Sequence, residues 1–162
     1  MSKLLQVILK SIKLVFLIAV IYSCNTSNES IDISAEDYHN SVDKVSQIMI
    51  HDIFSPPVAS RVFAYPNVAA YEIMAQGDSV YSTLTNTVKG LKAIPKPKES
   101  EPVNLKLSAL IAHMEISKML VFSEDRIDLI KDSLFIKWES TNKKEFLVSK
   151  NYALKVVGHI KS

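Results

Sequence analysis

The histidines are the first residues to consider as acids, bases or ligands, and the chain has four of them: His39, His51, His113 and His159. His51 precedes Asp52, a carboxylate that could orient an imidazole. Adjacent residues on a helix point about 100° apart, however, so this pair does not share a face. His113 and Glu115 are two residues apart and fail for the same reason. We expect polar groups at helix ends or near solvent, and an enzyme built on His51, Asp52 or His113 is the least favoured hypothesis.

Motifs for metal, phosphate or acyl chemistry are absent from the sequence. No HExxH, no CxxC and no histidine pair at i, i+4 occurs, so a metal site has no local support. The three glycines lie far apart, whereas a loop that cradles phosphate needs them clustered. No GxSxG nucleophile turn is present. In the pair Ser60-Arg61, we expect the arginine to lie on a helix surface, where it makes a salt bridge or caps a carbonyl. We therefore predict no catalytic, cofactor-binding or metal-binding residue.

The first 23 residues have the pattern of a secretory signal. Lys3 is followed by an apolar run over Leu14–Ile21 and by the letters IYSC, which end at Cys24. Cys24 is the only cysteine, so it cannot form an internal disulfide. Ile21–Cys24 resembles a bacterial lipobox, which implies acylation of Cys24 and a lipid partner. The alternative is a single-pass anchor over Val7–Tyr22, a stretch that is short for a span and contains two lysines.

The charge balance argues against a nucleic-acid partner. The chain carries 19 lysines and arginines against 17 acidic residues. Removal of residues 1–23 leaves 16 basic and 17 acidic residues, so no basic surplus remains for binding phosphates. We expect a membrane-anchored lipoprotein of the cell envelope, periplasmic or surface-facing, in which residues 24–33 form a polar tether and residues 34–162 a helical domain.

Helical periodicity dominates the rest of the chain, and no segment alternates as a strand does. We predict an all-α bundle of about five to six helices. The first expected helix is capped by Ser34 and has its apolar stripe over Tyr38–Met49, and the second is capped by Ser55. Two further helices are expected over Ser79–Leu91 and Val103–Phe122. The last two are expected after the cap Ser123 and from Thr141.

Three features of these helices carry further expectations. Val58, Val62, Tyr65, Ala69 and Ile73 should form the buried face of the second helix, with a kink or a break at Pro66, since proline removes one helical hydrogen bond. Val103–Phe122 is apolar on most faces and should be central and largely buried. The last helix keeps its apolar pattern up to Ser162, which predicts an incomplete half of a larger helical domain.

One stretch carries a family resemblance. Phe54–Glu72, with the letters FSPPVASRVFAYPNVAAYE, follows a lipoprotein-type signal and the letters VSQIMIHDIF. It resembles the N-terminal part of bacterial vanadium-dependent haloperoxidase-like lipoproteins, of the type 2 phosphatidic acid phosphatase superfamily. The resemblance implies a helical scaffold, and it implies vanadate or phosphate binding by three motifs further along: K-x6-R-P, P-S-G-H and S-R-x5-H-x3-D.

None of these three motifs occurs in this sequence. Arg61 and Arg126, the only arginines, are not followed by proline, and Gly158-His159 is not preceded by Pro-Ser. Ser60-Arg61 begins like the third motif, but Asn67 stands where histidine is required and Tyr71 where aspartate is required. The resemblance therefore implies fold and lineage without a catalytic residue, and vanadate only for a full-length relative. Whether the ancestral chemistry was haloperoxidase or phosphatase stays open.

Two functional hypotheses follow. The first is a truncated scaffold part of such a lipoprotein that is inactive alone and that exposes an apolar patch on Val103–Phe122 and Phe146–Ile160, where the rest of the domain would pack. The alternative is a self-sufficient, membrane-anchored helical binding module, which should have a closed core.

Overall fold

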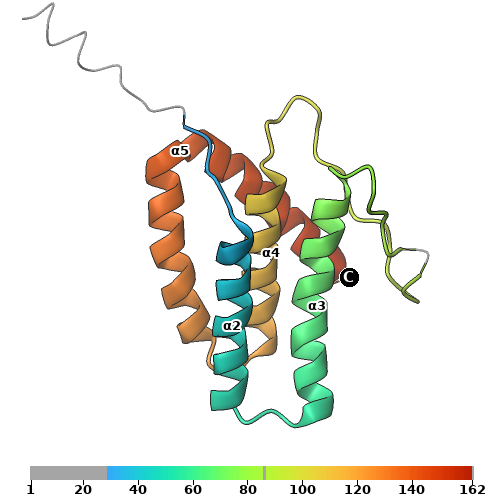
Figure 1. The fold of residues 1–162 in the computed structure, drawn as a ribbon, viewed down its shortest axis with the longest axis vertical. Coiled ribbons are helices and arrows are strands. Elements are labelled where there is room, and N and C mark those ends of the chain that lie inside the picture. The colour runs from blue at the N-terminus through green and yellow to red at the C-terminus, as the bar shows by residue number, and fades with distance from the viewer. Residues whose placement is uncertain (1–28, 86, 162) are drawn as a thin grey trace, which may run out of the picture.

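The computed structural model describes residues 29–85 and 87–161 of the chain. These residues form four α-helices and no strand, so the predicted all-α class is confirmed. The helices are α2 (Ala35–His51), α3 (Pro56–Ala75), α4 (Leu105–Leu120) and α5 (Glu124–Ile160). In Figure 1, α4 lies between α3 and the first part of α5, α2 stands in front of it, and the second part of α5 passes behind it.

Helix α2 begins where the sequence predicts. Ser34 is its N-cap: the backbone N–H of Asp37 donates to Ser34 Oγ at 3.1 Å, and the N–H of Ser34 donates to Asp37 Oδ2 at 2.8 Å. This reciprocal arrangement is a capping box. The helix ends at His51, and Asp52 is its C-cap. Ile53 then takes a φ of 55°, in the left-handed region that β-branched residues rarely enter.

Helix α3 runs through Pro66 as a single helix, so the predicted alternative of two short helices is wrong. Ser55 is its N-cap and the two prolines that follow occupy its first turn, as expected. Pro66 lies inside the helix and is itself buried. The buried face was also predicted partly wrongly, because Val58 and Tyr65 are 41% and 51% exposed. Pro66 takes a place on the face that packs, together with Val62, Ala69 and Ile73.

The predicted helix over Ser79–Leu91 is not formed; the described residues there are turns and loop. Side chains compete for the backbone hydrogen bonds that a helix would need. The N–H groups of Val80 and Tyr81 donate to Asp78 Oδ1 at 2.7 and 3.1 Å. Glu72 accepts from the N–H of Leu84 and from Thr83 Oγ1, both at 2.6 Å. This buried carboxylate therefore fixes the loop against the end of α3.

Helix α4 is the centre of the bundle, as predicted. Asn104 caps its start by accepting from the N–H of Leu107 at 3.0 Å. The stretch Leu107–Met114 is buried without interruption, and Ile116 and Ser117 follow it into the core. Three other segments supply the apolar surface that covers it: α3, both parts of α5 and the segment before α2.

Helix α5 combines the two helices expected after Ser123 and after Thr141. The backbone leaves helical geometry at Asn142, with φ −151° and ψ 90°, and the helix bends there. The Asn142 side chain accepts from the N–H of Glu145 at 3.1 Å, so it caps the second part of α5 as Ser or Asn caps a separate helix. After the bend the chain passes behind α4 toward α3 (Figure 1).

The residues just before α2 are held against the bend of α5. Ile31 and Ile33 are buried in the main core. The N–H of Ile31 and the hydroxyl of Ser30 donate to the Glu145 carboxylate, each at 2.9 Å. Asn104 Nδ2 donates both to the Ile31 carbonyl, at 2.7 Å, and to Glu145, at 2.9 Å. The packed domain therefore begins before Ser34, within the range assigned to the tether.

The expected apolar patch on Val103–Phe122 is absent from the described surface, because α4 is covered by its neighbours except near its C-terminal end. On Phe146–Ile160 the exposure is also limited: Leu147 and Leu154 are 41% exposed each, while Phe146 is buried. The most exposed large apolar side chains of the bundle are Phe122, the last residue of the first range, and others around the α2–α3 connection and on the first part of α5.

At the end of the bundle away from Asn142, Asp52 joins the α2–α3 connection to the α4–α5 connection. Its Oδ2 accepts from the N–H of Phe122 at 2.8 Å and from that of Ser123 at 3.0 Å. Its Oδ1 accepts from Ser123 Oγ and from His51 Nδ1. Burial of the carboxylate opposes ionisation, but the hydrogen bonds from Ser123, His51 and Phe122 outweigh it and lower the pKa of Asp52 to about 2.

His113 is the buried histidine of the bundle. It is 1% exposed, its ring lies 5.1 Å from that of Tyr38, and its Nδ1 shares a hydrogen bond of 3.0 Å with Ser41 Oγ. Burial lowers the pKa of His113 to about 4. The expectation that the histidines lie at helix ends or near solvent is therefore wrong for His113, because a neutral imidazole with a hydroxyl partner is tolerated in the core.

Replacement of Asp52 by alanine should lower the free energy of unfolding by about 1–3 kcal/mol, because it removes the charged acceptor shared by the N–H groups of Phe122 and Ser123. Since the folded pKa lies below the unfolded one, the contribution of Asp52 is complete above about pH 4 and is lost as the pH falls toward 2. Urea unfolding of wild type and variant between pH 7 and pH 2 measures the difference. A variant as stable as wild type at pH 7 would refute this role.

His113 should make the fold sensitive to mild acid. Its pKa is about 4 in the folded chain and about 6.5 in an unfolded one, so unfolding takes up a proton between these values and stability falls as the pH drops from about 6.5 to 4. Urea unfolding over this range measures the slope. His113→Asn should flatten it, whereas His39→Gln, at an exposed position, should keep it. An unchanged slope in His113→Asn would exclude His113 as its source.

Candidate functional site

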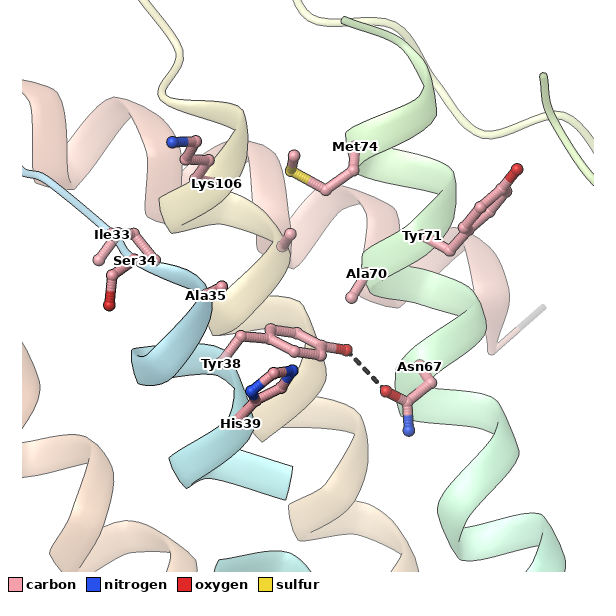
Figure 2. A pocket seen from close by; sticks show the side chains of 11 residues that line it. Ile33, Ser34, Ala35, Tyr38, His39, Asn67, Ala70, Tyr71, Met74 and Lys106 are labelled. Atoms are coloured by element: carbon pink, nitrogen blue, oxygen red, sulfur yellow. Dashed lines mark hydrogen bonds between the residues drawn. The ribbon is translucent and has the colours of Figure 1, made fainter. Parts of the chain in front are cut away.

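A cavity of about 570 Å³ opens between α2 and α3, with α4 behind it (Figure 2). Most of its wall is apolar, from Ile33, Ala35, Ala70, Met74 and Ala109. Its size is that of a small-molecule or side-chain pocket. The polar groups on the wall are few, and the residues concerned are Ser34, Tyr38, His39, Asn67, Tyr71 and Lys106.

Tyr38 reaches across the cavity from α2 to α3. Its hydroxyl donates to Asn67 Oδ1 at 2.8 Å (Figure 2). Asn67 Nδ2 in turn donates to the Phe63 carbonyl at 2.7 Å. Burial raises the pKa of Tyr38 well above its usual range, so the phenol stays protonated. The bridge closes one end of the cavity. Asn67 is thus a structural link between α2 and α3.

The remaining polar groups of the cavity do not form a nucleophile–base pair. The Tyr71 hydroxyl donates to the Ser82 carbonyl at 3.0 Å, which ties α3 to the loop. Lys106 and His39 lie on opposite sides of the opening in Figure 2. General base catalysis needs a base within hydrogen-bond reach of the proton it takes. The arrangement suits recognition of an apolar group more than a reaction.

His51 and Asp52 are closer than the sequence argument allows. Their side chains meet at 3.1 Å, because Asp52 is the C-cap and has left the helix that carries His51. Arg126 donates to His51 Nε2 at 3.1 Å, so the ring proton lies on Nδ1 and faces Asp52. Ser123 donates its hydroxyl proton to Asp52 and not to the imidazole. No activated serine results, and the cluster serves to connect two loops.

The other predicted candidates are separate from one another. Glu115 forms an ion pair of 2.7 Å with Lys131 of α5, away from the buried His113. Ser60 donates to the Pro57 carbonyl at 2.9 Å, and Arg61 is exposed on α3. His159 is half-buried near the end of α5. Sequence reasoning missed the cavity, because its wall comes from three helices whose relative placement no local pattern encodes.

The described residues do not fit a vanadate or phosphate site. An oxyanion of this kind is held by several converging cationic donors. Here Arg126 contacts His51, and Lys118 and Lys131 are paired with carboxylates at 2.6 and 2.7 Å. The cavity offers a single lysine and no arginine. Within residues 29–85 and 87–161, histidine, cysteine, aspartate and glutamate form no group of three that could hold a metal ion.

The predicted signal segment and Cys24 lie outside the described residues. Among the helices that the structure describes, none is both long enough and apolar enough to cross a membrane.

Comparison with known proteins finds a similar solved structure. No protein-family model matches the chain, and no curated protein does. Among solved structures, the chain is similar to a bacterial vanadium-dependent iodoperoxidase, with 53% sequence identity and a TM-score of 0.80. The match covers 82% of this chain and 32% of that protein, so this chain spans about a third of its length. Over the matched residues the similarity confirms the resemblance to the bacterial vanadium-dependent haloperoxidases, and it is consistent with the predicted N-terminal part of such a protein.

Proposed function

We propose that this chain is the helical scaffold part of a vanadium-dependent haloperoxidase-like or phosphatase-like lipoprotein and does not catalyse turnover by itself. The observation that carries the proposal is the match to the iodoperoxidase, at 53% identity over 82% of this chain but only 32% of that protein. The three oxyanion-binding motifs implied by the resemblance are absent from the 162 residues.

The dispersion of cations supports this proposal. A vanadate or phosphate group carries charge on several oxygens, and each needs a donor at a set position. The arginines and paired lysines described above point to separate parts of the bundle. The vanadate of a full-length relative would therefore be held by residues outside the part that corresponds to this chain, and these helices would support that site from behind.

Membrane anchoring is the second part of the proposal. Cys24 precedes Glu29 by five positions. From Glu29 on, the chain is held by Glu145, Asn104 and Asn142, whose side-chain amide donates to the Glu29 carbonyl at 3.2 Å. Five residues span at most about 18 Å when extended. Acylation of Cys24 would thus hold the α5 bend close to the lipid surface.

A self-sufficient, membrane-anchored binding module is the alternative, and one observation favours it. Helix α4 is covered on nearly all sides without any further polypeptide, as a closed core requires. The cavity beside Tyr38 would then be the binding site. This alternative shares the anchor and the absence of turnover with the first proposal, so the two differ in what the bundle contacts.

The purified chain should not oxidise iodide or bromide with vanadate and hydrogen peroxide, nor hydrolyse a phosphate monoester, because no converging oxyanion donors are available. Spectrophotometric assays against a vanadate-only blank, with the iodoperoxidase as positive control, measure this. Turnover that rises in proportion to the concentration of the chain would contradict the scaffold proposal. A cooperative thermal transition of a monomeric product would favour the binding module over the scaffold.

Replacement of Cys24 by serine should release the protein from the membrane fraction of a bacterial host, because a serine cannot take the thioether-linked lipid. Metabolic labelling with a radioactive or clickable fatty acid, followed by fractionation, measures both effects. Ser23→Ala is the control, since a small residue before the cleavage point is retained. Fatty-acid label that persists in the Cys24→Ser variant would refute lipidation at this position.

A further inference from the structure

The end of the bundle opposite the α5 bend carries an exposed apolar surface, which we name the tip and define as Ile50, Ile53 and Phe122. These side chains are 78%, 88% and 78% exposed. Ile50 lies in the last turn of α2, Ile53 in the α2–α3 connection and Phe122 in the α4–α5 connection, and both connections lie at the bottom of Figure 1. Apolar side chains of this size, gathered on one end of a soluble domain, indicate an interaction surface.

Ile53 adds an independent observation. Its φ of 55° is strained for a β-branched residue, whereas glycine adopts this geometry without strain. Its side chain is the most exposed of the large apolar ones in the described residues, so the bundle itself gains little from it. A strained residue that contributes little internally points to a role in an external contact.

The tip is also held rigid before any contact is made. Asp52 accepts hydrogen bonds from Phe122 and Ser123 and so joins the two connections. The half-buried Phe54 stacks under Phe122, with ring centroids 4.9 Å apart. A preorganised apolar surface loses little conformational entropy when it is covered.

We infer that the tip packs against the remainder of the haloperoxidase-like fold, the part for which this chain has no counterpart. The inference rests on the proposed function. The iodoperoxidase shares the bundle but is about three times as long, so a large further portion has to pack on some face of it. Helix α4, the face first expected, is already covered. Arg126 beside the tip has no carboxylate partner among the described residues, which suits an acidic residue on the covering segment.

A competing face exists on the first part of α5. Leu129 and Ile136 are 72% and 71% exposed and lie two turns apart on one side of the helix. Asp132 and Ser133, exposed and placed between them, interrupt the apolar stripe. Single apolar residues on a solvated face need no partner. These two positions therefore serve as matched controls of almost equal exposure.

The test compares two backgrounds. One is this chain with Cys24→Ser; the other is a full-length chimera in which residues 29–161 replace the matching segment of the iodoperoxidase, with iodide oxidation as proof of folding. Four substitutions are introduced one at a time into each background: Ile53→Cys, Phe122→Cys, Leu129→Cys and Ile136→Cys. The alkylation rate of each new thiol is measured, and the same background without the added cysteine serves as the blank.

In the isolated chain all four thiols should react at the rate of an exposed cysteine. In the chimera, Ile53→Cys and Phe122→Cys should react at least about tenfold more slowly, since a covered thiol reacts only through local opening, while Leu129→Cys and Ile136→Cys keep their rates. Unchanged rates at the tip, or slowing at the control positions alone, would overturn the inference. So would slow reaction of the tip in a self-associated isolated chain, since a second copy would then cover it.

A second measurement does not depend on the chimera. Ile53→Gly in the isolated chain should leave the urea midpoint unchanged or higher, because it removes strain and gives up no internal packing. A lower midpoint would show that the side chain already packs within the bundle, and it would overturn the inference. Turnover by the isolated chain would instead refute the proposed function and leave the labelling result intact.

Discussion

The burial of α4 is the constraint on which the rest of the structure depends. A helix that is apolar around its whole circumference has to be enclosed, because each apolar side chain left in water costs free energy in proportion to its exposed area. Leu107, Ala109 and Leu110 are almost inaccessible, and steps of about 100° per residue place them on different sides of the helix axis. The chain meets this demand with α3 on one side, the bent α5 on another and the segment of Ile31 and Ile33 on a third.

Enclosing one helix from several sides requires connections that hold, and polar side chains make them. Glu145 holds the segment before α2 against the bend of α5, Glu72 holds the long loop against α3, and Asp52 joins the two short connections at the tip. Each carboxylate accepts from backbone N–H groups that would otherwise lack partners. Carboxylates used in this way are committed to the fold, so they are not available as acids or bases in a reaction.

The polar contacts of the bundle also show what individual residues do in the part of the chain that shares the family likeness. The similarity to the iodoperoxidase extends over most of the bundle. Within it, the polar side chains described above make hydrogen bonds that hold the helices and their connections together. Asn67 illustrates this structural role: its Oδ1 accepts from the Tyr38 hydroxyl, and its Nδ2 donates to the Phe63 carbonyl within α3. A fold supports chemistry only where the site residues are also present.

The sequence alone determined the helical class, the N-cap positions of α2 and α3, the central position of α4 and the family resemblance, because these follow from periodicity, capping chemistry and one long local match. It wrongly predicted a helix after α3, where Asp78 and Glu72 accept hydrogen bonds from backbone N–H groups of a loop. It also wrongly predicted that Tyr65 is buried. Only the tertiary structure decided which apolar faces stay uncovered and that the C-cap Asp52 meets Ser123 across 71 residues. Such contacts depend on how helices pack against one another, and local spacing carries no information about that.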